Sequence, residues 1–149
     1  MRRLVLDTSV LVEYIVLRSV YRPKVDEIFN RSTAGEVELL ITPLTLSETL
    51  YIASKIYEAA GIHDPNDEAL NYVEWVKAKA KVIDMEDEII VRAGELKKLL
   101  HIALSDCYVI AAAERLKATP VFRSVEKEME PVLDELRRLG VRFLKEIEI

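Results

Sequence analysis

The sequence predicts an α/β fold in which a mostly parallel sheet of five strands lies between helices. Short apolar runs alternate with longer segments of helical periodicity along the whole chain, and this alternation is typical of strands joined by right-handed helical crossovers. A chain of 149 residues, half of them hydrophobic, can form one core without cross-links, and it shows no internal repeat or linker. We therefore expect a single domain over residues 1–149.

Two strands and three helices are predicted in the first half of the chain. Pro23 suits the first turn of a helix, and Gly61 suits the position just after a helix end. Thr45 and Glu48 have the spacing of a capping box at a helix start. The predicted elements are a strand at 4–6, a helix at 10–16, a helix from about Pro23 that ends at 32–35, a strand at 37–41 and a helix from Thr45 to about Ala60.

The second half of the chain continues the alternation after a loop of turn-forming residues at 61–67. In the segment at 87–100, Ile90, Ala93, Leu96 and Leu100 are expected to face inward. The predicted helices lie at 68–79, 87–100, 106–116 and 125–139, and the predicted strands lie at 82–83, 120–122 and 141–144.

Charge and composition argue against some classes of protein. Lys and Arg number 21 against 26 Asp and Glu, a net charge of -5, which argues against a protein that coats nucleic acid by bulk attraction. No signal peptide or bilayer-length apolar run is evident, and the one cysteine, Cys107, cannot form an internal disulfide. We expect a cytoplasmic protein. The lack of glutamine and the 32% of charged residues favour a thermophilic source.

Three carboxylates stand where ligands bind in open parallel sheets, beyond the carboxyl ends of the strands. Asp7 directly follows the first strand, Glu48 lies at the start of the helix after the second, and Asp106 opens the helix that leads to the fourth. Clustered carboxylates repel one another unless a cation joins them. Oxygen ligands indicate Mg²⁺ or Mn²⁺ rather than zinc, and Mg²⁺ held in this way serves phosphodiester hydrolysis.

Each of these acids also has a purely structural interpretation. Asp7 suits a helix N-cap, Glu48 suits the capping box with Thr45, and an acid such as Asp106 is favoured at a helix start by the macrodipole. Their joint placement after strands favours the functional interpretation. No nucleotide-cofactor motif and no Ser-His-Asp set is evident.

Other conspicuous residues are assigned structural roles. His63 lies in a polar loop and His101 at a helix end, and neither is given a catalytic role. Tyr72, Trp75 and Val76 share a helical face and are interpreted as core or interface, and Cys107 is interpreted as a small buried hydrophobe.

The sequence resembles the PIN-domain ribonucleases, in particular the VapC-type toxins of toxin–antitoxin pairs. Three segments resemble the acidic motifs of that family and come in its order: 4–11 (LVLDTSVL), 46–50 (LSETL) and 103–113 (ALSDCYVIAAA). The resemblance implies a PIN-like three-layer α/β/α domain and Mg²⁺- or Mn²⁺-dependent cleavage of RNA, with Asp7, Glu48 and Asp106 as metal ligands. It also implies a homodimer and a small antitoxin protein as partner.

The resemblance fails after the fourth strand, where the family commonly places an Asp in a Thr-x-Asp turn. Ser124 occupies that place here, and Glu126 follows two residues later. A neutral hydroxyl is a much weaker ligand for a hard cation than a carboxylate. We therefore predict that Glu126 joins the catalytic acids as an outer-sphere or second-metal ligand, with a helix-start role as its alternative.

Three other functions compete with this one. A phosphatase of the haloacid dehalogenase type needs a second Asp where Ser9 stands, and a receiver-like signalling domain, with Asp84 phosphorylated, needs paired acids after its first strand that are missing. A PIN-like module that has lost catalysis and binds RNA or protein is favoured by the change at Ser124.

RNA binding by an acidic protein requires basic side chains gathered near the cleft. The candidates lie in or beside the segments that follow the first and fourth strands: Arg18, Arg22, Lys24 and Arg123. A few phosphate contacts would make binding moderately dependent on salt.

Overall fold

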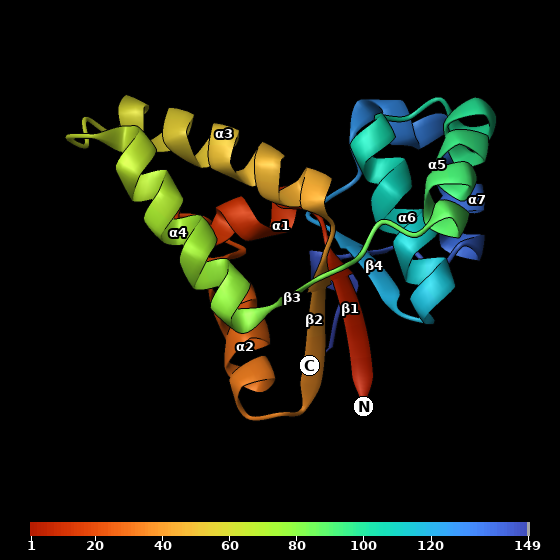
Figure 1. The fold of residues 1–149 in the computed structure, drawn as a ribbon, viewed down its shortest axis with the longest axis horizontal. Helices are drawn as coiled ribbons and strands as arrows, with labels where there is room; N and C mark the ends of the chain where they lie inside the picture. The colour runs from red at the N-terminus through yellow and green to blue at the C-terminus, as the bar shows by residue number, and fades with distance from the viewer. Residues whose placement is uncertain (149) are drawn as a thin grey trace.

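The structure, a computed structural model, describes residues 1–148. Its sheet has five strands in the order β3-β2-β1-β4-β5, and all four pairings are parallel (Figure 1). The strands are β1 (Arg2–Leu6), β2 (Val37–Ile41), β3 (Lys81–Val82), β4 (Thr119–Phe122) and β5 (Arg142–Phe143). The predicted α/β fold with a five-stranded, parallel sheet is confirmed.

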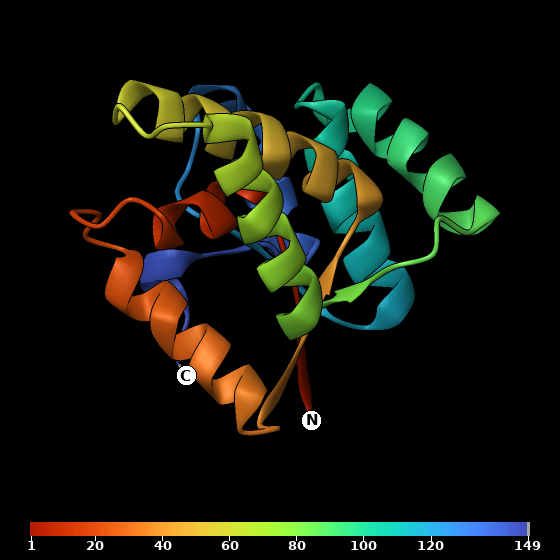
Figure 2. The ribbon, with the colours of Figure 1, turned by 60° about the vertical axis from the view of Figure 1, so that its left-hand side comes forward.

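Helices cover both faces of this sheet (Figures 1 and 2). On one face lie α1 (Thr8–Leu11), α2 (Arg22–Thr33), α3 (Pro43–Ala59) and α4 (Pro65–Lys79). On the other lie α5 (Asp87–Leu100), α6 (Leu104–Leu116) and α7 (Leu133–Arg138). Because successive strand residues point to opposite faces, Leu4 and Leu6 belong to the first core while Val5 belongs to the second.

The segment after β1 is not the helix predicted at 10–16. It forms α1 and then a short 3₁₀ helix, η1 (Val12–Tyr14). Valine and isoleucine at 10, 12, 15 and 16 restrict helix formation. The tighter turn also brings Glu13 into the protein, where it forms an ion pair with Arg123 at 3.0 Å.

The helix predicted at 125–139 is also broken. Residues Lys127–Val132 form a 3₁₀ helix, η2, before α7 begins, and η3 (Leu144–Glu146) follows β5. Pro131 lies inside η2, and proline has no amide hydrogen and clashes with the carbonyl four residues before it. Glu126 consequently lies in extended backbone at the start of η2, outside the helical turn that the sequence predicted for it.

Three smaller predictions are corrected. The cap of α3 is Thr42, whose side chain accepts a hydrogen bond from the Thr45 amide, so Thr45 and Glu48 form no capping box. Helix α4 begins at Pro65, inside the predicted loop. In α5 the inward residue is Ile89, whereas Ile90 is 43% exposed.

Within residues 1–148, no helix has the length and apolar character needed to cross a membrane.

Candidate functional site

The carboxyl ends of β1 and β4 lie side by side at the centre of the sheet. The Asp7 amide donates a hydrogen bond to the Val121 carbonyl at 3.0 Å, and the Arg123 amide donates one to the Ser9 hydroxyl at 3.1 Å. Strand order reverses at this point, since β2 lies on one side of β1 and β4 on the other. Open α/β sheets bind their ligands at such a switch point.

Four acids reach this point from different elements. Asp7 is the N-cap of α1, Glu48 lies on α3, Asp106 lies in the first turn of α6, and Glu126 starts η2. Helices that connect parallel strands begin at the carboxyl edge of the sheet, which is why the first turns of α1 and α6 bring their acids there. The four side chains line one cavity of about 190 Å³ together with Thr8, Ser9, Ile52, Ala103 and Ser105.

The structural and functional interpretations of Asp7 are compatible. One carboxyl oxygen, Oδ2, accepts a hydrogen bond from the Ser9 amide at 3.0 Å, as an N-cap does. The other, Oδ1, is buried and has no hydrogen-bond partner among residues 1–148. Asp7 is only 4% exposed and lines the cavity, so this oxygen lacks the donor that a buried polar atom requires.

Asp106 repeats this arrangement. It is 6% exposed, and its Oδ2 is likewise buried without a hydrogen-bond partner. Burial, together with the negative charges of Asp7 and Glu126, raises the pKa of Asp106 to about 8. Two orphan carboxyl oxygens, which lack hydrogen-bond partners within residues 1–148, therefore belong to residues that line the same cavity.

The same causes act on the neighbouring acids. Burial raises the pKa of Asp7, and the charge of Glu48 also raises it, whereas the hydrogen bonds from Ser9 lower it. Burial and the charge of Asp7 raise the pKa of Glu126. Glu48 is held in place by Ser105, whose hydroxyl donates to Oε2 at 3.4 Å.

This donor set fits a divalent cation of the Mg²⁺ class. The lining contains carboxyl and hydroxyl oxygens and no Lys, Arg, His or Cys, and hard cations prefer oxygen ligands. The two orphan oxygens of Asp7 and Asp106 are the atoms that such a cation would satisfy.

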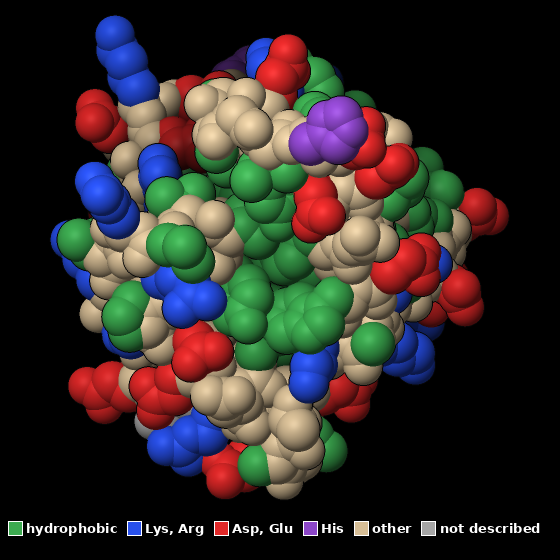
Figure 3. Space-filling model, turned by 90° about the vertical axis from the view of Figure 1, so that its left-hand side faces the viewer, with side chains coloured by type: hydrophobic (Ala, Val, Ile, Leu, Met, Phe, Trp, Pro, Cys, Tyr) green, Lys and Arg blue, Asp and Glu red, His purple; other side chains and the backbone are tan. Residues whose placement is uncertain are grey.

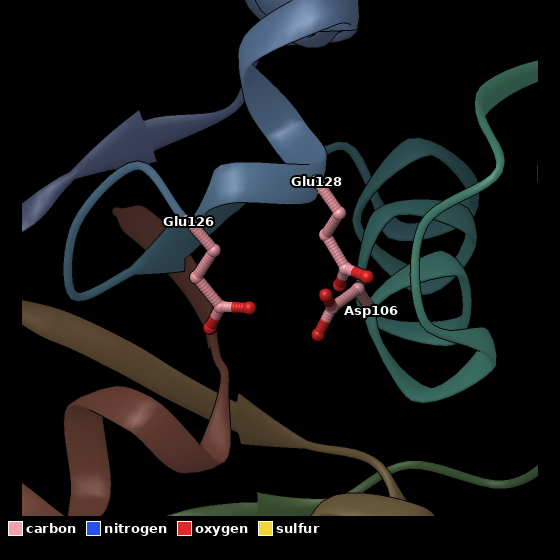
Figure 4. A group of neighbouring side chains, drawn as sticks. All are labelled: Asp106, Glu126 and Glu128. Carbon is pink, nitrogen blue, oxygen red and sulfur yellow. The ribbon is translucent and has the colours of Figure 1, made fainter.

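One acid at the site is missing from the sequence prediction. Glu128 lies beside Asp106 and Glu126, and one carboxyl oxygen from each of the three falls within 4.8 Å of the others (Figure 4). In a regular helix over 125–139, residues 126 and 128 would point to nearly opposite sides. Pro131 was the signal in the sequence that this helix is broken. Ser124 is not among the residues that line the cavity.

The predicted basic patch does not gather around the acidic cavity. The Lys24 ammonium donates to the Ile147 carbonyl at 2.6 Å, and Arg22 donates to the Tyr14 carbonyl at 2.9 Å. Arg18 and Arg22 border a different hollow. Arg123 is the one of these four residues that directly follows β4, and its guanidinium forms an ion pair with the buried Glu13.

That second hollow, which we call the apolar hollow, has a volume of about 740 Å³ and lies between η1, α3 and α4. Figure 3 shows its floor of hydrophobic side chains. Its walls include Tyr14, Leu17, Ile56, Tyr57, Ile62 and Trp75. Trp75 stacks on Tyr14 with 4.8 Å between ring centroids, while Tyr72 and Val76 are buried.

The remaining singled-out residues have structural surroundings. His63 is exposed and lies 3.3 Å from Asp64. His101 is the C-cap of α5 with a left-handed backbone, φ 58°. Cys107 is buried, and burial raises the pKa of its thiol to about 11.

Comparisons with known proteins agree with this architecture. Among solved structures, the fold is similar to that of VapBC2 from Rickettsia felis bound to promoter DNA, with a TM-score of 0.69, 16% identity, and 95% of this chain and 98% of that chain covered. It is similar to DNA-bound VapBC from Salmonella typhimurium, with a TM-score of 0.67, 20% identity, and 96% and 97% covered. For PAE2754 from Pyrobaculum aerophilum the TM-score is 0.58 at 16% identity, with 93% and 96% covered.

No curated protein sequence matches the chain. The family model of the PIN domain, however, matches residues 4–136. That range contains all three acidic motifs on which the resemblance rested, as well as Glu126 and Glu128. The chain belongs to the PIN domain family.

Proposed function

We propose that the chain is a Mg²⁺- or Mn²⁺-dependent endoribonuclease and the toxin of a VapBC-type toxin–antitoxin pair. The observation that carries the proposal is the convergence of Asp7, Glu48, Asp106 and Glu126 on one cavity in which two buried carboxyl oxygens lack partners. Membership of the PIN domain family supports the same activity.

Asp7 and Asp106 are the residues that would hold the cation, with Glu48 as the third ligand. A divalent cation in this position supplies Lewis-acid polarisation of a phosphodiester and offsets the negative charge that develops during hydrolysis. The chain itself fixes the ligands: the Ser9 amide orients Asp7, and the Ser105 hydroxyl orients Glu48. Glu126 extends the acidic wall of the cavity to the protein surface.

A protein antitoxin is the second part of the proposal. The solved structures with a similar fold include VapBC complexes and a toxin–antitoxin complex from Klebsiella pneumoniae. We assign the apolar hollow to this partner, because an amphipathic helix laid in an apolar groove is a common mode of recognition. A homodimer of this chain completes the proposed assembly.

The test compares two Asp→Asn substitutions. In Asp7→Asn, RNA cleavage in Mn²⁺ should fall on the order of a hundredfold or more, since even residues that only support metal ligands cost roughly 10- to 100-fold when changed. Asp84→Asn, the matched control, removes the same charge from an exposed residue outside the cavity and should leave cleavage unchanged. Cleavage of a mixed RNA pool, with and without chelator, is the measurement.

A binding module without catalysis is the second candidate, and the observation that favours it is Ser124 in place of the family's acid. The same experiment separates the two. If Asp7→Asn protein, purified free of host nucleases, cleaves RNA as fast as the parent, the catalytic proposal is wrong and the binding module remains.

A further inference from the structure

We propose that Tyr51 and Lys55 form a binding site for one nucleotide of single-stranded RNA, in which the base stacks on the Tyr51 ring and a phosphate contacts the Lys55 ammonium. The inference rests on the proposed function, because it names a surface that holds the substrate of the nuclease. Neither residue lines the acidic cavity. Arg22 and Lys24, which were predicted to bind RNA near the cleft, are engaged with other parts of the chain.

The exposure of Tyr51 is the first observation that points to such a site. Tyr51 is 61% exposed, whereas every other tyrosine, phenylalanine and tryptophan within residues 1–148 is buried or half-buried. An aromatic ring on the surface forgoes the burial that normally stabilises such a side chain. Every nucleobase has a π-face, and stacking on an exposed aromatic ring is a common way for proteins to hold single strands.

The position of Tyr51 on α3 is the second observation. Glu48 and Ile52 line the acidic cavity, and Tyr51 follows Glu48 by three residues, so the two are neighbours on the helix surface. Figure 1 shows α3 running outward from the carboxyl end of β2. Helical side chains lean towards the N-terminus of their helix, which tilts Tyr51 towards the cavity. A strand with a phosphate at the cavity therefore meets this ring about 4.5 Å farther along the helix axis.

Lys55 supplies the positive charge of the site. Its ammonium donates a hydrogen bond to the Tyr51 hydroxyl at 3.1 Å and lies 5.1 Å from the ring centroid. Both residues border a surface hollow of about 440 Å³ together with Ser47 and Ser54. Within that lining Lys55 is the one cation, and Glu58, the one acid, lies a turn farther from the acidic cavity. The ring, the hydroxyl groups and the ammonium suit a base, a sugar and a phosphate.

A single strand fits this surface better than a duplex does. Bases inside a duplex stack on one another and are not free to stack on a side chain. The net charge of -5 argues against broad attraction of phosphates by the whole protein. A neutral ring with one lysine beside it provides a local contact that does not depend on such attraction.

The experiment measures the binding of a short, fluorescein-labelled single-stranded RNA of mixed sequence. Fluorescence anisotropy in chelator gives Kd without cleavage. Tyr51→Leu, which keeps an apolar side chain but removes the ring, should weaken binding on the order of tenfold, whereas Tyr51→Phe should bind as the parent does. Lys55→Gln should weaken binding and reduce the salt slope by about 0.7, the value for one phosphate contact with a single strand.

Val91→Ala and Lys98→Gln are the matched controls. Val91 is also 61% exposed, and both are exposed residues of α5 outside the hollow and the acidic cavity. Neither change should alter Kd. In Mn²⁺, Tyr51→Leu should raise the KM for RNA cleavage and leave kcat nearly unchanged, because the ring binds the substrate away from the reacting phosphate.

Two results with a parent that cleaves RNA would overturn the stacking site and leave the nuclease proposal standing. One is a parental Kd in Tyr51→Leu, and the other is a loss in Tyr51→Phe as large as that in Tyr51→Leu. Analytical ultracentrifugation adds a third: a parent dimer that becomes a monomer in Tyr51→Leu would assign the ring to a contact between two copies and overturn the site. A parent that neither binds nor cleaves RNA would overturn both proposals.

Discussion

Two buried carboxyl groups, Asp7 and Asp106, face one small cavity, and each has an oxygen without a donor. In the absence of a cation, this pair costs folding free energy, because burial and like charge both disfavour ionisation. A cation bound between the two groups, as proposed above, would reverse this local loss of stability. Functional sites commonly show this kind of compromise.

Asp106 makes that cost measurable as a dependence on pH. Its pKa is about 8 in the folded chain, against 3.8 for an ordinary aspartate. Between these values the folded state binds more protons than the unfolded state, so the free energy of unfolding falls as pH rises from about 4 to 8. In the presence of chelator, the free energy of unfolding of Asp106→Asn should fall less steeply with pH than that of the parent, by up to about 1.4 kcal/mol per pH unit.

Urea unfolding at pH 5, 6, 7 and 8 measures the slope for the parent and for Asp106→Asn. Asp84→Asn, at an exposed position, is the control and should keep the parental slope. Equal slopes in the parent and Asp106→Asn would show that Asp106 ionises as an ordinary exposed acid, in conflict with its burial.

The sequence predicted most of the acids that form the candidate site, but it did not predict all of the residues around them. Asp7, Glu48, Asp106 and Glu126 do come together, because their places after strands and at helix starts follow from α/β topology. Glu128 was missed, because the predicted helix over 125–139 took no account of the break that Pro131 signals. Arg18, Arg22 and Lys24 were expected near the cleft, but long flexible side chains choose partners that sequence position does not specify.

Among the elements, the loop after β4 is tied to the segment after β1 by Arg123. Its amide donates to Ser9, and its guanidinium pairs with Glu13, which is 7% exposed. Glu13 also accepts a short hydrogen bond from Ser19. These contacts link β4, α1 and η1 just before the start of η2, where Glu126 lies.

Removal of the Arg123 side chain should therefore both destabilise the protein and loosen the site. Arg123→Ala leaves the buried Glu13 carboxylate without the positive charge that pairs with it, which costs about 1–2 kcal/mol after allowance for the half-exposed guanidinium. Arg138→Ala, which removes an exposed arginine that pairs with Glu135, should cost under about 0.5 kcal/mol.

A double-mutant cycle with Glu13→Gln, followed by urea unfolding, tests the assignment. The loss in the double variant should be smaller than the sum of the two single losses, and Arg123→Lys should restore part of the stability. Additive losses would mean that the two side chains do not stabilise each other in solution.

Helix boundaries show where a pattern in the sequence is insufficient. The sequence placed Ile90 inside α5, whereas Ile89 is buried and Ile90 is exposed. Both residues are compatible with helical periodicity, and only the way in which α5 rests on α6 decides between them. The helices predicted at 10–16 and 125–139 were wrong because β-branched residues in the first segment and an internal proline in the second oppose a regular helix.

For the whole molecule, alternation along the chain was enough to predict five parallel strands but not their order. The order β3-β2-β1-β4-β5 places β1 at the centre and the acidic cavity at its carboxyl end. Elements from both halves of the chain meet there, so a ligand bound at the cavity stabilises the entire fold rather than one segment.

Mn²⁺ should accordingly raise the melting temperature of the protein. At a concentration about 100 times Kd, one bound ion adds about 2.7 kcal/mol, which corresponds to roughly 5–10 °C for a chain of this size. Asp106→Asn should melt at a higher temperature than the parent in chelator, yet respond less to Mn²⁺. Differential scanning calorimetry in chelator and in Mn²⁺ measures both effects. Identical curves for the two proteins would mean that Asp106 has only a structural role at the start of its helix.

The single tryptophan of the chain, Trp75, lies in the wall of the apolar hollow and not in the lining of the acidic cavity. Its indole ring is partly exposed and stacks on Tyr14. Fluorescence of the unlabelled protein, excited at a wavelength that tyrosine does not absorb, therefore reports on this surface alone. A partner that covers the indole would shift its emission to shorter wavelength, so occupation of the hollow can be followed optically with every carboxylate of the acidic cavity left intact.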